Sequence, residues 1–296
     1  MRRAARLAIV VVVAFYAASV LLTENALHVW NTVPPADAEA GAIAMQGAAS
    51  WKPVSVESNH GAMLKAWMFT PRQSNGAGVI LMHGIADTRL GMSGHAPFLL
   101  RAGYTVLMPD SRGHGGSTGS IITSGVRESH DVQRWADLLS RAPNVVRLYG
   151  IGQSMGAAIL LESLSCESRF RALVADCSFA TFEEIANDRL SQHGIRSGAL
   201  RWPLIELGFT YARLRYGVDL WSASPAAALQ RSHTPVLLIH GAADDNIPLR
   251  HSRELYATYH TNSQLWEVPG AGHVASMSSQ PALYCQRVLA WFDTHR

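Results

Sequence analysis

The chain has very few lysines, and no cluster of positive charge occurs beyond its N-terminus. Lys52 and Lys65 are its only lysines, and neither belongs to a phosphate-binding loop. The formal net charge is +3, and Arg2, Arg3 and Arg6 account for the whole excess. Because no basic run or aromatic-spaced basic stripe occurs, we expect no nucleic-acid partner.

Cysteine is also scarce, and the motifs that bind common cofactors are missing. Cys166, Cys177 and Cys285 have no metal-ligand spacing, and buried free thiols are their expected state. An exported protein could form one disulfide and leave one thiol over, but the sequence does not choose the pair. No H-E-x-x-H, no C-x-x-C and no G-x-G-x-x-G after a first strand occurs, so we predict no cofactor and no metal.

Charge is absent from residues 7–23, which read LAIVVVVAFYAASVLLT. As a helix this run covers about 25 Å, slightly less than a hydrocarbon core. Arg6 before the run and Trp30 beyond it suit the two membrane boundaries, and the early arginines predict a cytoplasmic N-terminus with an extracytoplasmic body. We therefore predict a cytoplasmic tail at 1–6, a transmembrane signal-anchor helix at 7–23 and a linker at 24–52.

Two alternatives to a retained anchor are left open by the sequence. A cleaved signal peptide would release a secreted protein, and the small residues at 17–19 suit cleavage. The apolar residues at 20–22 extend the run past that point, which favours the anchor. A buried first helix of the soluble fold is the other alternative, and so uniform an apolar run disfavours it.

Apolar strand-like runs alternate with helix-like stretches from Val54 to Phe292. This alternation predicts an α/β fold with a mostly parallel central sheet flanked by helices. No linker rich in Pro, Gly or Ser interrupts it, and no internal repeat is present. Residues 53–296 are therefore expected to form one domain.

One connection in this domain is longer than a crossover helix needs. It joins the predicted strand that ends at Ala175 to the one that begins at Val236. We predict a small helical cap in this insertion, at about 182–224. Trp202 and Phe209 are the residues expected to line an apolar acyl pocket beneath the cap, because an apolar ligand needs apolar walls.

The pentapeptide Gly152-Gln153-Ser154-Met155-Gly156 follows a strand-like run at 145–149 and precedes a helix start at 157–161. Strand, G-x-S-x-G and helix in this order are typical of a nucleophile elbow, which exposes a serine hydroxyl above a sheet. Its glycines remove side chains that would collide at so sharp a turn. A glycine-rich turn without chemistry is the alternative, so Ser154 needs partners before it is a nucleophile.

A serine nucleophile needs a base to take its proton and a carboxylate to orient that base. His273 is the candidate base, because it lies on a glycine-rich loop directly after a predicted strand. Asp244 is the preferred acid, because a short loop after another buried-type strand delivers it. Asp245, its neighbour, and Asp176, at a third strand end, are the alternatives.

His83 and His240 also end predicted strands, at 79–82 and 236–239. A histidine in such a position packs or hydrogen-bonds beneath a site more often than it reacts, so we expect that role for both. Six other histidines are weaker candidates by position: His28 and His60 precede the sheet, His295 is terminal, and His130, His251 and His260 fall on predicted helices.

With these residues in view, the chain resembles the α/β-hydrolase superfamily from about residue 53 to the C-terminus. The order Ser154, Asp244, His273 matches the family's order of nucleophile, acid and base. His240-Gly241, Asp244 and Pro248 are similar to its acid loop, and this spacing favours Asp244 over Asp245. Within the superfamily the chain looks most like bacterial membrane-anchored serine hydrolases, which include esterases, lipases and peptidase-like enzymes.

The resemblance extends to two loops beside the elbow. Residues 110–117, DSRGHGGS, look like the family's D-x-R-G-x-G-x-S loop, which has a structural role there. The fold builds its oxyanion hole from the residue after the nucleophile and from the loop after an earlier strand. The resemblance therefore implies that the backbone N–H groups of Ile85 and Met155 bind the oxyanion.

We expect a serine hydrolase that cleaves carboxylic esters, with lipid esters and thioesters included, through an acyl-enzyme on Ser154. His273 would be its general base, and Asp244 would orient the imidazole. An aminopeptidase or acylpeptide hydrolase is the alternative enzyme, and a catalytically silent membrane-attached binding scaffold is the alternative of another class. The expected partners are a small-molecule or lipid ester and, through the N-terminal helix, a membrane.

Overall fold

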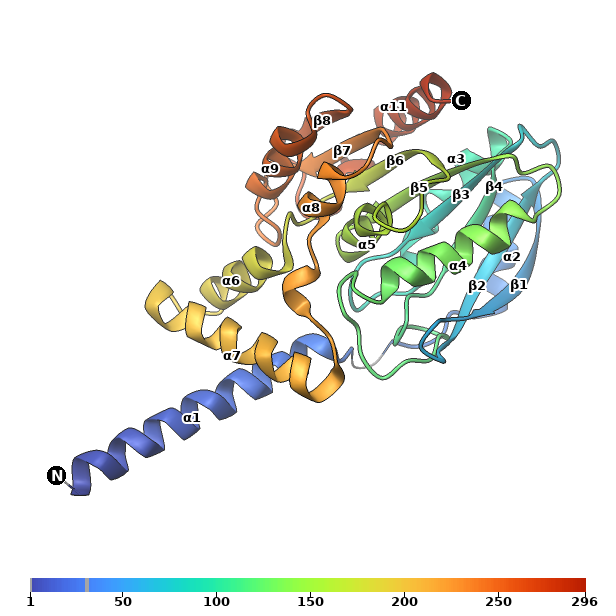
Figure 1. Cartoon of the computed structure of the whole chain (residues 1–296). Helices are drawn as coiled ribbons and strands as arrows, with labels where there is room; N and C mark the ends of the chain where they lie inside the picture. Colours follow the sequence, from blue (N-terminus) through green and yellow to red (C-terminus); the bar gives the residue numbers. More distant parts are fainter. Residues whose placement is uncertain (1, 30–31) are drawn as a thin grey trace.

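An eight-stranded sheet forms the centre of the protein in the computed structural model, which describes residues 2–29 and 32–296 (Figure 1). The strand order is β1-β2-β4-β3-β5-β6-β7-β8, with β1, β2 and β4 paired antiparallel and the other pairs parallel. The strands are β1 (Ala49–Glu57), β2 (Met63–Pro71), β3 (Ala77–Met82), β4 (Thr105–Pro109), β5 (Arg147–Gln153), β6 (Phe170–Asp176), β7 (Val236–Gly241) and β8 (Ser263–Val268). The parallel strands β3 to β7 are almost wholly buried, as expected for strands covered on both faces.

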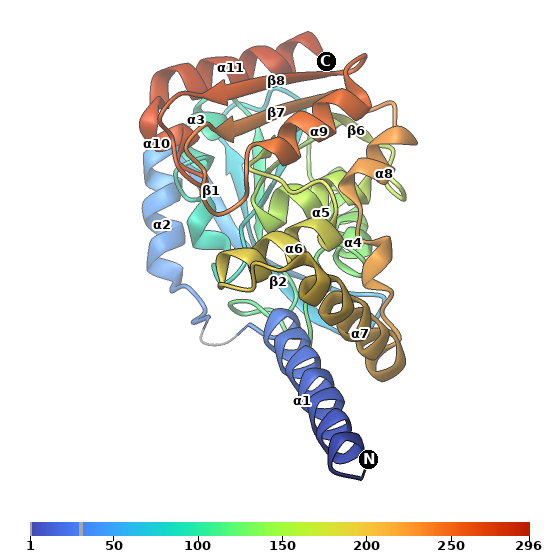
Figure 2. The ribbon, with the colours of Figure 1, turned by 90° about the vertical axis from the view of Figure 1, so that its left-hand side faces the viewer.

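Helices cover both faces of the sheet, and each layer buries its own hydrophobic cluster (Figures 1 and 2). One layer consists of α4 (Glu128–Ser140), α5 (Met155–Ser163), α8 (Pro225–Gln230) and α9 (Arg250–Tyr259), which bury Trp135, Leu160, Leu229 and Leu255. The other consists of α2 (Asp37–Gln46), α3 (Ala96–Arg101) and α11 (Pro281–Thr294), which bury Ile43, Leu99 and Phe292. The predicted α/β fold class is confirmed.

The insertion between β6 and β7 is helical. It contains α6 (Phe182–Gln192), α7 (Gly198–Tyr216) and the 3-10 turn η2 (Leu220–Ser222). Ile205, Phe209 and Val218 form a small hydrophobic cluster of their own with Leu27 from the N-terminal helix. The cap thus has a separate core, and part of that core comes from outside the insertion.

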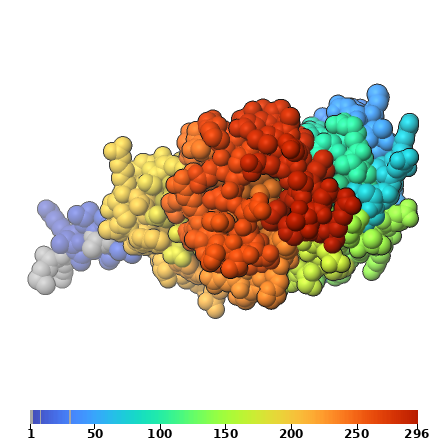
Figure 3. Space-filling model, turned by 90° about the horizontal axis from the view of Figure 1, so that it is seen from above, coloured from blue at the N-terminus to red at the C-terminus, as the bar shows by residue number. Residues whose placement is uncertain are grey.

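The N-terminal helix α1 (Arg2–Leu27) continues past the predicted boundary at residue 23 and projects from the body beside the cap (Figures 1 and 3). The described part of the predicted linker 24–52 differs from the prediction, because it contains α2 and the start of β1. A capping bond from the amide of Ala36 to the Glu39 carboxylate (2.8 Å) begins α2. The predicted boundary residue Trp30 lies outside the described residues.

The loop after β4 is held by buried ion pairs. The carboxylate of Asp110 pairs with the Arg89 guanidinium (2.5 Å) and accepts hydrogen bonds from the backbone N–H of Arg89 and of Gly116, both at 2.7 Å. Arg112 donates to both carboxylate oxygens of Asp131, at 2.8 and 2.6 Å. Because each of these buried charges has a hydrogen-bonded partner, the loop is fixed against η1 (Arg89–Met92) and α4. A hydrogen bond from the Asp110 N–H to the Lys65 carbonyl (2.9 Å) joins it to β2. These contacts agree with a structural role for the D-x-R-G-x-G-x-S sequence.

Close backbone contacts let β5 turn directly into α5. β5 continues to Gln153, beyond the predicted strand at 145–149, and pairs there with β3 and β6. A Cβ on Gly152 would lie 2.4 Å from the carbonyl oxygen of Gly156, and a Cβ on Gly156 would lie 2.3 Å from that of Met82. Both glycines therefore remove collisions with backbone atoms, as the sequence indicated.

Replacing Gly156 by alanine should lower the free energy of unfolding by about 1–3 kcal/mol, because the new methyl group forces β3 and α5 apart. Gly41 in α2 is a matched control, since a Cβ there would meet no atom within 4 Å. Gly41→Ala should leave stability unchanged or raise it by up to about 1 kcal/mol. Denaturant unfolding measures both variants, and wild-type stability of Gly156→Ala would contradict the close packing of the turn.

Candidate active site

Ser154 lies at the tip of the turn between β5 and α5, at the carboxyl end of the parallel strands. Its backbone has φ 53° and ψ −120°, a conformation that costs energy for a residue with a side chain. The turn is held because the Ser154 N–H donates to the carbonyl oxygen of Asp176 (2.8 Å) and the Ser154 carbonyl accepts from Ala157 (3.0 Å). The residue is only 6% exposed.

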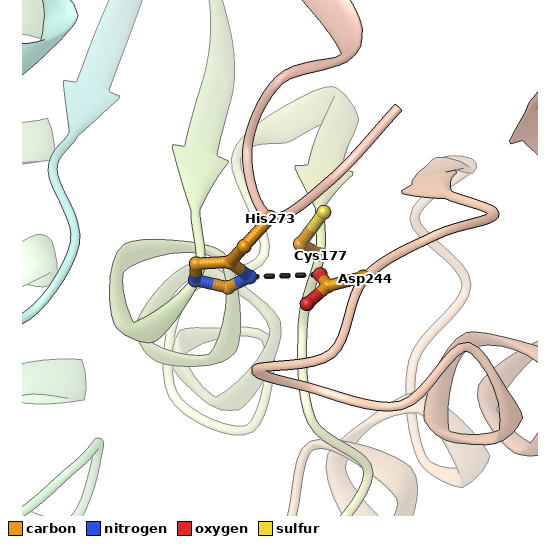
Figure 4. Close-up of side chains that lie close together, drawn as sticks. All are labelled: Cys177, Asp244 and His273. Carbon is orange, nitrogen blue, oxygen red and sulfur yellow. Dashed lines mark hydrogen bonds and ion pairs between the residues drawn. The ribbon is translucent and has the colours of Figure 1, made fainter. Parts of the chain in front are cut away.

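His273 connects Ser154 to Asp244. Its Nδ1 lies 2.8 Å from Asp244 Oδ2, and its Nε2 lies 2.9 Å from Ser154 Oγ. Figure 4 shows the imidazole and the carboxylate facing each other from two loops, one after β8 and one after β7. In the tautomer protonated at Nδ1, the ring donates to Asp244 and accepts from the Ser154 hydroxyl. The structure thus brings the three predicted residues together.

Asp244 is buried and held as an anion. Its Oδ1 accepts hydrogen bonds from the backbone N–H groups of Asn246 and Ile247, both at 2.9 Å. Burial by itself raises the pKa of this carboxyl, but hydrogen bonds from His240, His273 and the Ile247 amide outweigh it and lower the pKa below its usual range. A carboxylate that is ionised at neutral pH next to Nδ1 can stabilise positive charge on the imidazole.

The two alternative acids lie elsewhere. Asp245 follows Asp244 in the chain but is exposed to solvent. Asp176 is fully buried, its Oδ1 accepts from the Ser276 hydroxyl (3.0 Å), and burial raises its pKa to about 6. Within the described residues neither carboxylate hydrogen-bonds to His273, so Asp244 is the acid that the geometry selects.

The predicted oxyanion donors, Ile85 and Met155, both line the cavity that contains Ser154. Met155 is the first residue of α5, so its N–H is one of the helix donors without an intrahelical acceptor. A Cβ on Gly84 would lie 3.4 Å from the Cβ of Ser154, which shows how closely the loop after β3 approaches the serine. Among the described hydrogen bonds, neither the Ile85 nor the Met155 amide donates to a protein acceptor.

Two buried histidines hold the loop that contains Ile85. His83 Nδ1 bonds to the Gly84 carbonyl (2.7 Å), and its Nε2 accepts from the Ser111 N–H (3.0 Å). His114 Nε2 accepts from the Ala86 N–H at 3.3 Å. Burial lowers the pKa of His83 to about 4 and also lowers the pKa of His114, so both rings can accept these bonds at neutral pH.

The sequence did not predict the role of His114, although the position of this residue inside the DSRGHGGS loop was a usable signal.

The expectation that His83 and His240 hydrogen-bond beneath the site is confirmed. His240 Nδ1 bonds to the Ser252 hydroxyl (2.6 Å), and its Nε2 bonds to the Ile247 carbonyl (2.8 Å). His240 therefore holds the loop after β7, on which Asp244 lies.

A cavity of about 420 Å³ opens beside Ser154 and is lined mainly by apolar side chains. Its walls come from the turn after β5, from the cap helices α6 and α7, and from the last turns of α1. A larger hollow, of about 640 Å³, lies at the opposite ends of the strands around Val145, Phe170 and Pro235. Ligands of open α/β sheets bind at the carboxyl ends of the strands, so the smaller cavity is the candidate site.

The two predicted pocket residues have different surroundings. Phe209 is buried, lines the cavity and stacks on Phe182, with ring centroids 5.6 Å apart. Trp202 does not line the cavity, because it lies on the outer side of α7 and is 45% exposed. The prediction for Trp202 is corrected accordingly. Its error arose because the helical phase of α7 turns Leu204, Ile205 and Phe209 inward instead.

Cys177 lies next to the acid and the imidazole, and the ligand atoms of Cys177, Asp244 and His273 are all within 4.8 Å of one another (Figure 4). This chemistry does not suit a metal. Burial and the neighbouring Asp176 raise the pKa of the Cys177 thiol well above its usual range, whereas metals bind the thiolate. Both ring nitrogens of His273 are also occupied by Asp244 and Ser154. All three cysteines of the chain are free thiols.

Comparison with known proteins places this arrangement in a family. A family model described as "Alpha/beta hydrolase family" matches residues 79–287. The uncharacterized protein YfhR of Escherichia coli K12 is similar, with 30% identity over 243 residues, which cover 78% of this chain and 76% of YfhR.

Solved structures show the same fold. The esterase Pf2001 of Pyrococcus furiosus superposes with a TM-score of 0.72 at 21% identity, covering 91% of this chain and 98% of the esterase. The acylaminoacyl peptidase of Pyrococcus horikoshii superposes with a TM-score of 0.62 at 16% identity, covering 83% of this chain and 42% of the peptidase. At these identities the likeness concerns the fold alone. The family model, which matches most of the chain, establishes that the chain belongs to the alpha/beta hydrolase family and is a hydrolase.

Proposed function

We propose that the protein is a serine hydrolase that cleaves carboxylic esters through an acyl-enzyme on Ser154. The observation that carries the proposal is the continuous hydrogen-bonded chain from Ser154 Oγ to His273 Nε2 (2.9 Å) and from His273 Nδ1 to Asp244 Oδ2 (2.8 Å). These distances suit proton transfer from the hydroxyl to a base that is itself oriented by a buried anion. Ser154 is the nucleophile, His273 the general base and Asp244 the orienting carboxylate.

The reaction follows in two halves. Ser154 Oγ bonds to the ester carbonyl carbon while His273 takes the hydroxyl proton, and the oxyanion forms against the amides of Ile85 and Met155. His273 then gives the proton to the departing alkoxide, which leaves as an alcohol. Water attacks the acyl-enzyme with the same base, and the carboxylic acid leaves as Ser154 recovers its proton.

The cavity favours an ester with an apolar acyl group over a peptide terminus. An aminopeptidase needs a carboxylate to hold the substrate's amino group, and among the described residues that line the cavity none is Asp or Glu. The esterase Pf2001 supports the ester proposal by its fold, and the acylaminoacyl peptidase is the reason to include an amide substrate in the first assay panel.

The protein is further proposed to be anchored by α1, with its arginine-flanked end in the cytoplasm and the hydrolase domain outside. The segment Arg3–Leu27 is long and apolar enough to cross a membrane. Leu7, Val10 and Val13 are exposed, so in water this part of the helix would leave its apolar side chains unburied. The positive charge that precedes it supports the orientation.

Ser154→Ala should abolish covalent labelling by a fluorophosphonate probe and lower p-nitrophenyl ester turnover by about 10⁴-fold or more, because the nucleophile is lost. Labelling of the purified wild type and the variant, followed by ester kinetics on both, measures the effect. Wild-type protein that takes up no probe and turns over no ester or amide would instead support a catalytically silent scaffold.

Asp244→Asn should lower kcat by about 10³–10⁴-fold, because the amide NH2 group can donate a hydrogen bond to Nδ1 and so favours the wrong tautomer of His273, in which Nδ1 carries no proton. Asp245→Asn is the matched control: this neighbour is exposed and does not contact the imidazole, so its kcat should stay within about twofold of wild type. The proposed acid would be wrong if Asp245→Asn were the damaging change and Asp244→Asn the mild one.

A further inference from the structure

The last turns of α1 form one wall of the cavity that contains Ser154. Ser19, Leu22, Thr23 and Ala26 line this cavity together with residues of the elbow and the cap. These α1 residues follow one another at helical spacing, so one face of the helix is turned to the cavity. A segment that the sequence predicts to be a membrane helix is therefore also part of the wall of this cavity.

This wall is attached to the cap by a close helix crossing. The Ser19 hydroxyl donates to the carbonyl oxygen of Leu204 in α7 at 2.6 Å. A Cβ on Gly208 would lie 2.3 Å from Thr23 Oγ1, so α7 has a glycine where α1 comes nearest. Small residues at such a crossing allow the two backbones to approach, as in helix pairs within membranes.

The end of α1 is joined to the fold by further contacts, some half-buried and some fully buried. The Glu24 carboxylate accepts hydrogen bonds from the hydroxyls of Tyr211 (2.6 Å) and Tyr216 (2.8 Å). Leu27 is 1% exposed in the core of the cap, and its carbonyl oxygen accepts from the Ile122 N–H at 2.8 Å. Loss of this segment would open the pocket and leave the partners of Glu24 and Leu27 uncovered.

The length of the apolar run in α1 indicates where the pocket would lie relative to a bilayer. Residues 7–23 cover about 25 Å, and a hydrocarbon core is about 30 Å thick. With Arg6 at one boundary, the other boundary therefore falls at the turns that line the pocket. Leu22 and Ala26 are exposed on this stretch, so the wall continues onto the outer surface of the helix. In an anchored protein this surface would face the lipid. The Glu24 carboxylate, paired with two tyrosine hydroxyls, is tolerated at such a depth.

We propose that α1 is retained in the mature enzyme as a wall of the acyl pocket, and that the substrate is an acyl ester of a membrane lipid, which enters from the bilayer along Leu22 and Ala26. The inference rests on the proposed ester hydrolysis at Ser154. The acyl chain lies against α1 and the cap, and its carbonyl carbon is attacked by Ser154 Oγ. The deacylated lipid alcohol leaves first, and water then releases the fatty acid.

The first test determines whether the reactive protein contains the wall. Membranes of expressing cells are treated with a small alkyl fluorophosphonate, and the mass of the labelled protein is measured. We expect the labelled species to be in the membrane fraction and to contain Ser19–Leu27. A labelled species that begins after Leu27 would overturn the proposal, whereas ester hydrolysis at Ser154 would still stand.

The second test changes the wall and follows chain-length preference. Ala26→Trp narrows the pocket, so the full-length enzyme in phosphatidylcholine vesicles should lose turnover of p-nitrophenyl palmitate relative to p-nitrophenyl acetate by about tenfold. This is the effect of excluding about two methylene groups from the pocket. Leu21→Trp is the matched control, because Leu21 is 70% exposed and outside the cavity lining. It should keep the wild-type ratio.

The outcomes separate this inference from the proposed function. If the Ala26→Trp enzyme takes up the fluorophosphonate and keeps the wild-type ratio of palmitate to acetate turnover, only the proposal that α1 is a wall of the acyl pocket is contradicted. Wild type without labelling or acetate turnover would contradict the ester hydrolase proposal itself. If Ala26→Trp takes up no probe, Ala26→Leu replaces it, and a ratio unchanged by this smaller wall residue likewise contradicts the proposal.

Discussion

The rest of the structure depends on one strained turn. Strand β5 passes into α5 through a serine at positive φ, and this is feasible only because Gly152 and Gly156 have no Cβ where their backbones meet other backbone atoms. The turn fixes the Ser154 hydroxyl above the carboxyl ends of the strands. Loops after β7 and β8 end at the same edge, so residues distant in sequence meet there. The buried sheet supplies the rigidity that keeps such a conformation from relaxing.

Around this turn, hydrogen bonds fix both the Asp244 carboxylate and the loop that contains Ile85. Asp244 is held ionised by two backbone amides and two histidines, and it can support a positive imidazole. His83 and His114 stay neutral through burial and hold the loop with the Ile85 amide. The apolar part of the site has a different origin, because the cap and α1 together enclose it. The polar groups of the candidate site thus come from the loops at the strand ends, whereas most of the apolar cavity walls come from the cap and α1.

Local sequence motifs predicted much of this arrangement. The strand, G-x-S-x-G and helix sequence predicted the turn at Ser154, and loop position predicted His273 and Asp244 beside it. The sequence left Asp245 as an alternative acid, because only the conformation of the loop decides which of two adjacent aspartates is buried beside the histidine. Trp202 was misplaced because the aromatic residues of α7 do not reveal its helical phase. The contact between α1 and α7 joins distant segments, and no local pattern encodes it.

The central claim is that Ser154 becomes covalently acylated during turnover. The most direct measurement is peptide mass mapping of wild-type enzyme quenched in acid while it hydrolyses a p-nitrophenyl ester. The account predicts that the acyl mass is found on Ser154 in the peptide that contains Gly152–Gly156. Steady ester hydrolysis with no acylated peptide, or with the acyl group on another side chain, would contradict it.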